Sequence, residues 1–545
     1  MSLHPMAGQR AQESLLVDLD ALVSKYYRIP DASRVEQCVV FGTSGHRGSS
    51  LRMSFNEAHI LAIAQAVVDY RKDQGYLGPL FVGKDTHALS LPAERSVLEV
   101  LAANGVLVIF QEEDGFTPTP VISRHILAHN ANHPELLADG LVITPSHNPP
   151  EDGGIKYNPP HGGPADTDVT NWIEQRANHY LQNRLDGVRR VPYEQAVLAT
   201  NVNAEDLAAA YIEALGQVID MAAIRDSGLR IGVDPMGGAA VHYWSRIAKH
   251  YGLNIEVVNP SLDPRFAFMP LDHDGKIRMD CSSPYAMLGL LQLKDRFEVA
   301  WGNDADVDRH GIVVPELGLL NPNHYLALAI DYLLTHRENW PVDAAIGKTV
   351  VSSSLIDRVV AGHQRRLYEV PVGFKWFSTG LLAGNLGFCG EESAGASFLD
   401  IKGHPWATDK DGIILGLLAA EMIAVTGQRL DDRLQALFDR YGQPAYLRVD
   451  AAISPEKKAA FKQLTAAMID CPSFAGECVL ATMTHAPGNG AGIGGIKVMT
   501  ENAWFAARPS GTEDIFKIYA ESFLGEAHLK TVLVEAQSLL DRILS

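Results

Sequence analysis

Cysteine is scarce in this chain of 545 residues, which argues against a fold held together by disulfides. The five cysteines are odd in number and scattered, and no two stand at CxxC spacing; they are Cys38, Cys281, Cys389, Cys471 and Cys478. A disulfide framework and a structural zinc site both require regularly spaced cysteines. The sequence therefore predicts a protein of a reducing compartment, the cytoplasm, without structural zinc.

Long apolar runs are also missing. Near the N-terminus, Leu15-Leu16-Val17 is interrupted by Asp18 and Asp20, which excludes the continuous apolar segment of a signal peptide. The most apolar later run, from Gly412 to Ala420, stops at Glu421, far short of the roughly 20 residues that a membrane-spanning helix needs. We expect a buried helix there and no membrane partner.

Positive charge is in deficit. The 46 Lys and Arg residues face 65 Asp and Glu residues, for a formal net charge of −19. The average surface therefore repels nucleic acid and anionic membranes, and no nucleic-acid partner is expected. An anionic small substrate would need a locally basic cleft. With 46% hydrophobic and 20% charged residues the chain has an ordinary globular composition, and its length indicates about three to four domains.

Nucleotide-binding motifs are absent as well. Gly490–Gly495 matches GxGxxG in letters, but the residues after it, Val498-Met499, do not open a helix, which is the required context. Gly347-Lys348-Thr349 lacks the glycine that a phosphate-binding P-loop carries five positions earlier. No nucleotide site is supported.

Alternation of helix-like and strand-like stretches is what the sequence does contain. Helical spacing at about 15–26, 55–70, 92–104 and 168–181 alternates with apolar runs near 39–41, 80–82, 106–110 and 141–143. This order is typical of a mostly parallel α/β sheet. A second unit is expected to begin near Asn203 with a helix to Gly216. The predicted domains are 1–202, 203–319, 320–442 and 443–545.

One predicted strand end carries a candidate nucleophile. Leu141-Val142-Ile143 is followed by Thr144-Pro-Ser-His-Asn-Pro-Pro150, whose prolines indicate a short rigid loop. Open α/β sheets bind ligands at the carboxyl ends of their strands. Ser146 beside His147 is the minimum for an activated hydroxyl. Taken alone, however, the motif fits a Pro-rich turn better, with Ser and Asn bonded to nearby backbone.

A second loop carries a candidate metal site. Asp304, Asp306 and Asp308, at a spacing of two, can converge on one cation, and three carboxylates suit Mg²⁺ or Ca²⁺. An EF-hand is excluded, because the glycine and the glutamate that its loop requires are absent. The alternative is a solvated acidic loop. The apolar runs 299–301 and 312–314 argue against it, since three like charges between buried strands would be costly without a cation.

Three further loops fit ligand binding, each with an ordinary surface turn as the alternative. Gly390-Glu-Glu-Ser-Ala-Gly395 offers two carboxylates and a hydroxyl to sugar hydroxyls. Arg508-Pro-Ser-Gly-Thr512 offers a guanidinium, two hydroxyls and free backbone N–H groups to a phosphate. The loop Gly42–Gly48 combines Gly, Ser and Thr with Arg47 and fits the same purpose.

Together and in this order, the loops resemble the signatures of the α-D-phosphohexomutase superfamily, specifically its bacterial glucose-phosphate branch, over nearly the whole chain. Residues 144–149 resemble its phosphoserine loop, 304–309 its magnesium loop, 390–393 its sugar-binding loop and 508–512 its phosphate loop; 42–47 and 154–157 resemble its opening signature and the stretch carrying its general-base lysine. The resemblance implies an α/β fold with three related mixed α/β domains and a smaller α+β C-terminal domain around a central cleft.

The resemblance also implies a role for each matching residue. Ser146 would carry the phosphoryl group, Lys156 would act as general base and His147 would support it. Mg²⁺ would be held by Asp304, Asp306 and Asp308 with a phosphate oxygen on Ser146. Substrate would be bound by Arg47, Arg309, Lys375, Glu391, Ser393, Arg508, Ser510, Gly511 and Thr512. Glu392 favours glucose, because the glucosamine and dual mannose/glucose branches usually carry Gln or Met there.

The implied activity is reversible interconversion of α-D-glucose 1-phosphate and glucose 6-phosphate. Glucose 1,6-bisphosphate would serve as intermediate and activator. Three alternatives stay open: a metal-dependent sugar-phosphate phosphatase, a mutase for mannose or glucosamine phosphates, and a non-catalytic sugar-phosphate sensor. The intact serine and Asp triad disfavour the sensor. We expect small-molecule sugar phosphates as partners and a monomer or a homodimer.

Overall fold

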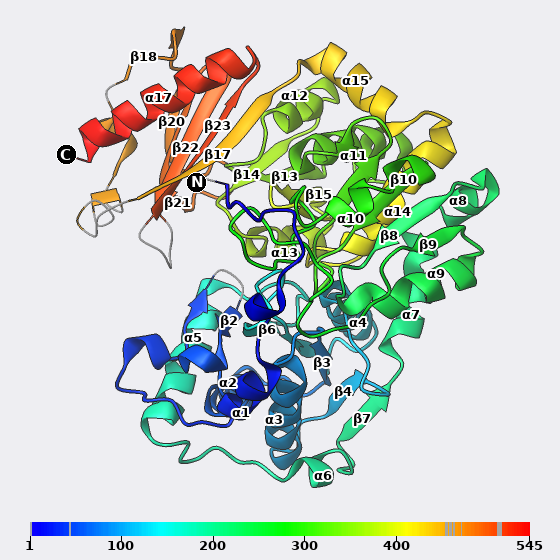
Figure 1. Cartoon of the computed structure of the whole chain (residues 1–545), viewed down its shortest axis with the longest axis vertical. Coiled ribbons are helices and arrows are strands. Elements are labelled where there is room, and N and C mark those ends of the chain that lie inside the picture. Colours follow the sequence, from blue (N-terminus) through cyan, green and yellow to red (C-terminus); the bar gives the residue numbers. More distant parts are fainter. Residues whose placement is uncertain are drawn as a thin grey trace.

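The computed structural model describes residues 3–42, 45–452, 456, 460–461, 464–469, 471–509 and 515–544. Figure 1 shows four groups of elements that follow one another in the chain: blue to cyan, green, yellow-green and orange to red. Each group contains one main sheet, and we number the groups domains I to IV.

Domain I is a seven-stranded sheet in the order β1-β2-β6-β5-β3-β4-β7. Its strands are β1 (Phe41–Gly42), β2 (Gly45–Gly48), β3 (Leu80–Lys84), β4 (Val108–Gln111), β5 (Asp139–Ile143), β6 (Gly153–Asn158) and β7 (Val202–Glu205). Its main helices are α1 (Leu19–Tyr26), α2 (Glu57–Gln74), α3 (Ser90–Ala103), α4 (Thr119–Asn132) and α5 (Thr167–Gln182). Strands β5, β3, β4 and β7 are parallel, as the alternation predicted, and β6 runs antiparallel to β5.

Two sequence-based expectations in this region are wrong. The first helix begins at Leu19 rather than near Leu15, because the Asp18 carboxylate caps it by accepting from the Ala21 N–H at 3.0 Å. Residues from Asn203 onward do not begin a helix either. They form β7, paired with β4, and α7 starts only at Leu207. The short stretch has little strand propensity of its own, so sheet pairing decides its conformation.

Domains II and III repeat the plan on smaller sheets. Domain II has the order β12-β11-β10-β8-β9, from β8 (Ile231–Asp234), β9 (Ile255–Val257), β10 (Val299–Gly302), β11 (Gly311–Val314) and β12 (Gly318–Leu319), with helices α7 (Leu207–Ala214), α8 (Met221–Ser227), α9 (Tyr243–Tyr251) and α10 (Leu288–Leu291). Domain III has the order β14-β13-β15-β16, from β13 (Ala345–Thr349), β14 (Leu367–Val370), β15 (Leu386–Glu391) and β16 (Gly395–Phe398), with helices α11 (Pro322–His336), α12 (Leu355–Gly362), α13 (Lys375–Leu382), α14 (Gly412–Thr426) and α15 (Leu430–Tyr441).

Helix α14 joins the cores of domains II and III, and it confirms the predicted buried helix. Its residues from Gly412 to Ile423 are all buried. A side chain at Gly416 would clash with the indole of Trp301 on β10, so glycine lets the helix lie directly against the domain II sheet. Asp411 begins the helix by accepting from the N–H groups of Ile413 and Ile414. The apolar run is therefore an inter-domain core element.

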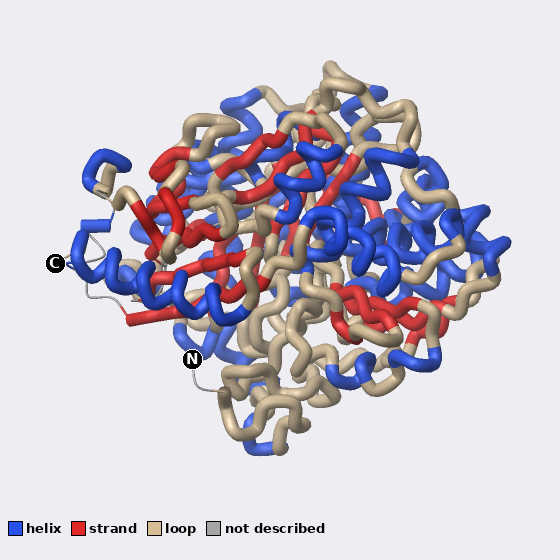
Figure 2. Tube along the Cα trace, turned by 90° about the horizontal axis from the view of Figure 1, so that it is seen from above, coloured by secondary structure: helices blue, strands red, loops and turns tan. Residues whose placement is uncertain are grey.

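Domain IV is different, an antiparallel sheet in the order β17-β23-β22-β21-β20. Its strands are β17 (Ala445–Ala452), β20 (Ala481–His485), β21 (Gly492–Met499), β22 (Ala503–Pro509) and β23 (Ile515–Ser522), beside a small β18–β19 hairpin (Ser473–Phe474 and Glu477–Cys478). Helix α17 (Glu526–Ile543) lies along the sheet, as Figure 2 shows from above. Of the helix predicted near 455–469, residues 455, 457–459 and 462–463 lie outside the described residues, and Ala466–Met468 form a short 3₁₀ helix.

The segment before α1 ties domain II to domain I. Backbone hydrogen bonds join Gly8 N–H to Leu271 O and Leu271 N–H to Gln9 O, both at 2.8 Å, and Leu16 packs against the domain II core. Farther along, the Leu22 carbonyl accepts from Ser50 Oγ of domain I at 2.6 Å. We call residues 4–16 the N-terminal strap. Within the described residues, no single helix is long and apolar enough to cross a membrane.

Candidate active site

The loops predicted to carry chemistry in domains I to III occupy equivalent positions. Each follows a strand with a parallel neighbour on one side and leads back into an antiparallel strand: β5 to β6, β10 to β11, and β15 to β16. Each loop also holds one non-glycine residue in the left-handed region, namely Ser146 (φ 63°), Val307 (φ 65°) and Ala394 (φ 69°). Such conformations concentrate at functional sites. This repeat was not legible in the sequence.

The first two loops meet at Ser146. Its side chain is buried, and Ser146 Oγ lies 3.1 Å from Asp304 Oδ2 and 3.3 Å from His147 Nδ1. Burial and the nearby Arg309 guanidinium lower the pKa of His147 well below its usual range, so the imidazole is neutral at neutral pH. Ser146 therefore faces a carboxylate of domain II and a neutral imidazole from its own loop.

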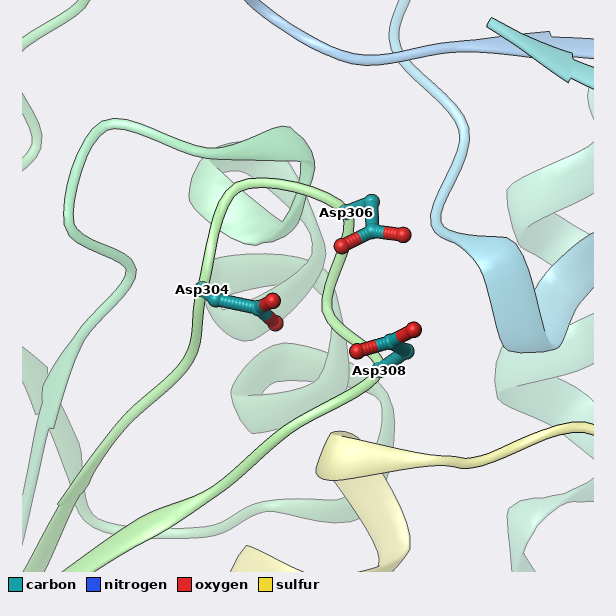
Figure 3. Close-up of side chains that lie close together, drawn as sticks. All are labelled: Asp304, Asp306 and Asp308. Carbon is teal, nitrogen blue, oxygen red and sulfur yellow. The ribbon is translucent and has the colours of Figure 1, made fainter. Parts of the chain in front are cut away.

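The three predicted metal ligands converge. Figure 3 shows Asp304, Asp306 and Asp308 on the single loop between β10 and β11, with the carboxylates of Asp304 and Asp308 turned into the loop. One oxygen from each of the three lies within 4.8 Å of the others, and all three residues are buried. Hydrogen bonds from Ser146 to Asp304 and from Thr119 to Asp306 place this loop against domain I.

The Asp cluster fits a hard divalent cation. Asp306 Oδ1 and Asp308 Oδ1 are buried, and no group among the described residues donates a hydrogen bond to them, which is costly unless a cation takes that place. Burial and the like charges of Asp306 and Asp308 raise the pKa of Asp304 well above its usual range. The three aspartates offer carboxylate oxygens as metal ligands, and such ligands suit Mg²⁺ or Ca²⁺. The residues present therefore match the expected metal.

Lys156 reaches the cluster from β6 of domain I. Its Nζ lies 2.5 Å from Asp306 Oδ2 and 3.3 Å from Asp308 Oδ2. Although burial opposes it, these two carboxylates raise the pKa of Lys156, so in this arrangement it is an ammonium. Gly154 permits the approach: a Cβ there would clash with the Thr144 carbonyl, so only glycine lets β6 run so close to the Ser146 loop.

Sequence reasoning missed Lys410. Its Nζ lies 3.0 Å from Asp308 Oδ2 and 3.9 Å from Glu391 Oε2, so one buried ammonium joins the metal-site loop to the sugar-binding turn. A Cβ on Gly412 would clash with the Arg309 carbonyl, so glycine lets the start of α14 carry Lys410 this close. The available signal was the charged triplet Asp409-Lys410-Asp411 directly before an apolar run.

A second missed residue is Thr119, the first residue of α4. Its Oγ1 donates to Asp306 Oδ2 at 2.8 Å, and its backbone N–H donates to the Asp306 carbonyl at 2.9 Å. Domain I thus holds the middle aspartate of domain II at two points. The available sequence signal was the run Thr117-Pro118-Thr119-Pro120, which indicates a turn.

The predicted basic residues surround the triad. The Arg309 Nε lies 3.8 Å from Asp304 Oδ2 and 3.7 Å from Asp308 Oδ1. Arg47 on β2 pairs in register with Gly154 on β6; burial lowers the pKa of its guanidinium, and the three nearby aspartates oppose that shift. With Lys156 and Lys410, four cationic side chains lie around the cluster despite the acidic surface of the chain.

The predicted sugar-binding turn, residues 390–395, lies on the domain III side of the Asp cluster. Glu391 is buried, accepts from the Gly373 N–H at 3.0 Å and faces Lys410. Glu392 Oε2 accepts from Thr349 Oγ1 at 2.9 Å and from Ser352 Oγ at 3.4 Å. Ser393 is partly exposed at the turn. Lys375 instead contacts Thr167 Oγ1 of α5, at the junction of domains I and III.

Only the start of the predicted phosphate cradle is described. Arg508 and Pro509 end strand β22, while Ser510, Gly511 and Thr512 lie outside the described residues. Burial and Glu392 raise the pKa of Tyr519 to about 12, and Arg508 acts on the same phenol in the opposite direction. Tyr519 on β23 therefore has Glu392 of domain III and Arg508 of domain IV close by.

Models of the phosphoglucomutase/phosphomannomutase family match the chain in four consecutive segments. Its alpha/beta/alpha domain I matches residues 39–184, domain II residues 209–318, domain III residues 321–441, and its C-terminal domain residues 451–537. Each matched segment contains most of the strands of one of the four sheets described above; β7 of domain I and most of β17 of domain IV lie outside the matches.

Whole-chain comparisons agree. The chain is 57% identical over 543 residues to a phosphoglucomutase of Komagataeibacter xylinus, which covers 99% of this chain and 98% of that protein. It is 28% identical over 443 residues to phosphoglucomutase 1 of Saccharomyces cerevisiae, covering 75% and 74% of the two chains. Among solved structures, the pp63/parafusin phosphoglucomutase of Paramecium superposes with a TM-score of 0.72 at 20% identity, covering 94% and 96%, which shows a shared fold.

Proposed function

The chain belongs to the phosphoglucomutase/phosphomannomutase family, and on that basis we propose that it interconverts α-D-glucose 1-phosphate and glucose 6-phosphate. The observation that carries the proposal is the meeting of Ser146 Oγ with Asp304 Oδ2 at 3.1 Å. A serine in a buried carboxylate cluster ringed by four cationic side chains suits reversible phosphoryl transfer better than hydrolysis at an open surface.

In the proposed cycle, Ser146 alternately carries and gives up a phosphoryl group. The bond between phosphorus and Ser146 Oγ breaks as the bond to a sugar hydroxyl forms, and the hydroxyl proton passes to a base. Lys156 is the candidate base. Because it is an ammonium while it contacts Asp306 and Asp308, it can act as a base only after it has released a proton to solvent, which becomes easier once those carboxylates engage another cation.

Asp304, Asp306 and Asp308 are the residues that would hold Mg²⁺ in this proposal. The bound ion would supply neutralisation of charge on the transferring phosphoryl group. Arg309, Lys410 and Arg47 add fixed positive charge around the same place, so the acidic chain still presents an attractive site to a sugar phosphate.

Glu391, Ser393 and Lys375 are proposed to bind the sugar and its phosphate at the domain III side of the site. Glu392 supports a preference for glucose through its fixed orientation: Thr349 and Ser352 engage Oε2, which leaves Oε1 for a sugar hydroxyl. Mannose and glucosamine phosphates are the competing substrates that an assay should include.

Arg508, with Ser510, Gly511 and Thr512, is proposed to bind the phosphate remote from Ser146. The bisphosphate intermediate would then turn end for end and exchange its two phosphates between the sites. Proximity of Arg508 and Glu392 to the same Tyr519 supports a cradle that faces the sugar-binding turn.

The test is ³¹P NMR of the purified protein with glucose 1-phosphate and Mg²⁺, with and without added glucose 1,6-bisphosphate. We expect glucose 6-phosphate to accumulate without inorganic phosphate, and faster with the bisphosphate. Release of inorganic phosphate at the rate of substrate loss would instead favour the phosphatase alternative. The cytoplasmic location, the monomer or homodimer state and the residue limits of the four domains stay predictions.

A further inference from the structure

Ser146 holds a conformation that its own residue type disfavours. Its φ of 63° lies in the left-handed region, which is energetically unfavourable for a non-glycine residue. One contact that maintains it is local, since the Ser146 N–H donates to Thr144 Oγ1 at 2.8 Å. The question is what holds Thr144.

Thr144 is held by a buried carboxylate on the neighbouring strand end. Its Oγ1 donates to Asp85 Oδ2 at 2.6 Å. Asp85 directly follows β3, which is parallel to β5, and its own N–H donates to the Ile143 carbonyl at 3.0 Å. Ser90 Oγ donates to the other carboxylate oxygen at 2.6 Å. Asp85 thus contacts the stretch before Ser146 through side chain and backbone.

His87 completes the arrangement on the other side of Ser146. Its Nδ1 lies 2.8 Å from Asp85 Oδ2, and its Nε2 lies 3.1 Å from the Asn148 carbonyl. An ionised carboxylate and a carbonyl can only accept, so both ring nitrogens must donate, and His87 is an imidazolium. Asp85 and His87 are each no more than 2% exposed, and the ring of Phe266 from domain II lies 5.0 Å from the imidazolium ring.

We propose that Asp85 and His87 are positioning residues, a buried clamp that grips the phosphoserine loop on both sides of Ser146 and holds its hydroxyl in line for phosphoryl transfer. This rests on the proposed function. Among the described contacts, the clamp reaches residues 144 and 148 and none of Asp304, Asp306 and Asp308, so its expected effect is on kcat rather than on substrate binding.

Electrostatics favour the charged pair. Although burial disfavours charge, Asp85 raises the pKa of His87, and Asp152 adds to the effect. His87, together with the hydroxyls of Ser90 and Thr144, lowers the pKa of Asp85 in turn. Asp152 is itself paired with the Arg52 guanidinium at 2.6 Å.

A merely structural ion pair is the competing explanation, and the same sheet provides its control. Lys84, the residue before Asp85, pairs with Glu94 at 2.7 Å, and both side chains are 2% exposed. Glu94 lies on α3, and no described contact of this pair reaches the Ser146 loop. Glu94→Gln and Asp85→Asn therefore each neutralise one carboxylate of an equally buried pair.

The experiment compares kcat and KM for glucose 1-phosphate, and phosphate on Ser146 by intact mass, in wild type, Asp85→Asn and Glu94→Gln. Thermal unfolding fixes the folded fraction of each. We expect Asp85→Asn to lose on the order of 10²-fold in kcat with KM within about twofold, and Glu94→Gln to keep wild-type kcat per folded molecule. Equal kcat in the two variants would overturn the clamp. Failure of the wild type to form glucose 6-phosphate would overturn the proposed function instead.

A conservative pair covers the case in which Asp85→Asn does not fold. Thr144→Ser keeps the hydroxyl that links Asp85 to Ser146 N–H, whereas Thr144→Val is isosteric and lacks it. We expect kcat of Thr144→Val to fall on the order of 10²-fold, as for Asp85→Asn, and kcat of Thr144→Ser to stay within about threefold of wild type. A loss of kcat in both variants, or in neither, contradicts the clamp.

Histidine-selective ¹⁵N labelling tests the protonation of His87 directly. Wild type should show an imidazolium with both nitrogens protonated at pH 7, absent from His87→Gln. A neutral tautomer at that position would contradict the double donation and with it the clamp.

Discussion

The junction between domains I and II differs in kind from the junction between domains III and IV. The first junction contains the site, where Ser146 meets Asp304 and both Lys156 and Thr119 meet Asp306, beside an apolar cluster that the two domains share. At the second, a buried ion pair of Lys497 on β21 with Glu369 on β14, 2.7 Å apart, is accompanied by an apolar cluster that includes Val351, Trp504 and Tyr519.

This difference separates two consequences of mutation. A substitution at the I–II junction removes reacting groups from a site that no single domain contains, so activity should fall while each core stays packed. A substitution at the III–IV junction should weaken the attachment of a domain whose own core is intact. The following predictions test the separation, from the largest expected effect to the smallest.

Ser146→Ala should abolish turnover, a loss on the order of 10⁴-fold or more, since no described hydroxyl replaces the phosphoryl carrier. A single buried hydroxyl contributes little packing, so the melting temperature should stay close to that of wild type. Coupled assay of glucose 6-phosphate and intact mass, with loss of any phosphoprotein species, are the measurements. A mutant that keeps most of its activity would remove Ser146 from the mechanism.

Asp306→Asn should reduce turnover on the order of 10²- to 10³-fold, because it loses charge at the centre of the metal site. EDTA should remove the activity of the wild type, and Mg²⁺ should restore it. Titration of Mg²⁺ against rate gives the apparent affinity for each protein. Undiminished activity in excess chelator would rule out the metal role of this loop.

Arg508→Ala should lower kcat/KM for glucose 1-phosphate by about 30- to 150-fold, the worth of one charge-assisted Arg–phosphate contact. Both kcat and KM should change, since binding of the remote phosphate orients the reacting hydroxyl. Added glucose 1,6-bisphosphate should partly restore the rate, because the intermediate escapes more readily. Steady-state kinetics with and without bisphosphate decide the matter, and unchanged kinetics would exclude Arg508 from the cradle.

Glu369→Gln should leave kcat near that of wild type and lower stability by about 3–5 kcal/mol, because it strands Lys497 without its buried partner. Burial opposes ionisation of Glu369, but Lys497 and Lys348 together hold its pKa below the usual 4.5. The stabilisation is therefore complete above pH 4.5 and is lost as pH falls through the lowered pKa. Urea unfolding of both proteins at pH 7 and at pH 4 should show the gap between them shrinking. A gap of constant size would mean that the ion pair is not its source.

Sequence alone located the loops that interrupt apolar strands with unusual residues, and the convergence of Asp304, Asp306 and Asp308 is confirmed. The family and the α/β class are confirmed as well. Sequence reasoning missed Lys410 and Thr119, because their contacts with Asp308 and Asp306 depend on how α14 and α4 pack against the loop between β10 and β11. The packing of α14 in turn depends on Gly412, because any side chain there would clash with the Arg309 carbonyl, a neighbour that only the structure reveals.

The N-terminal strap sets a length scale for movement within the molecule. Between Leu16, packed on domain II, and Leu22, bonded to domain I, the chain has three extended steps and then three helical ones. Fully stretched, that link spans about 15 Å. It acts as a short tether: the two domains that meet at Ser146 cannot part farther than its slack allows unless the strap peels away.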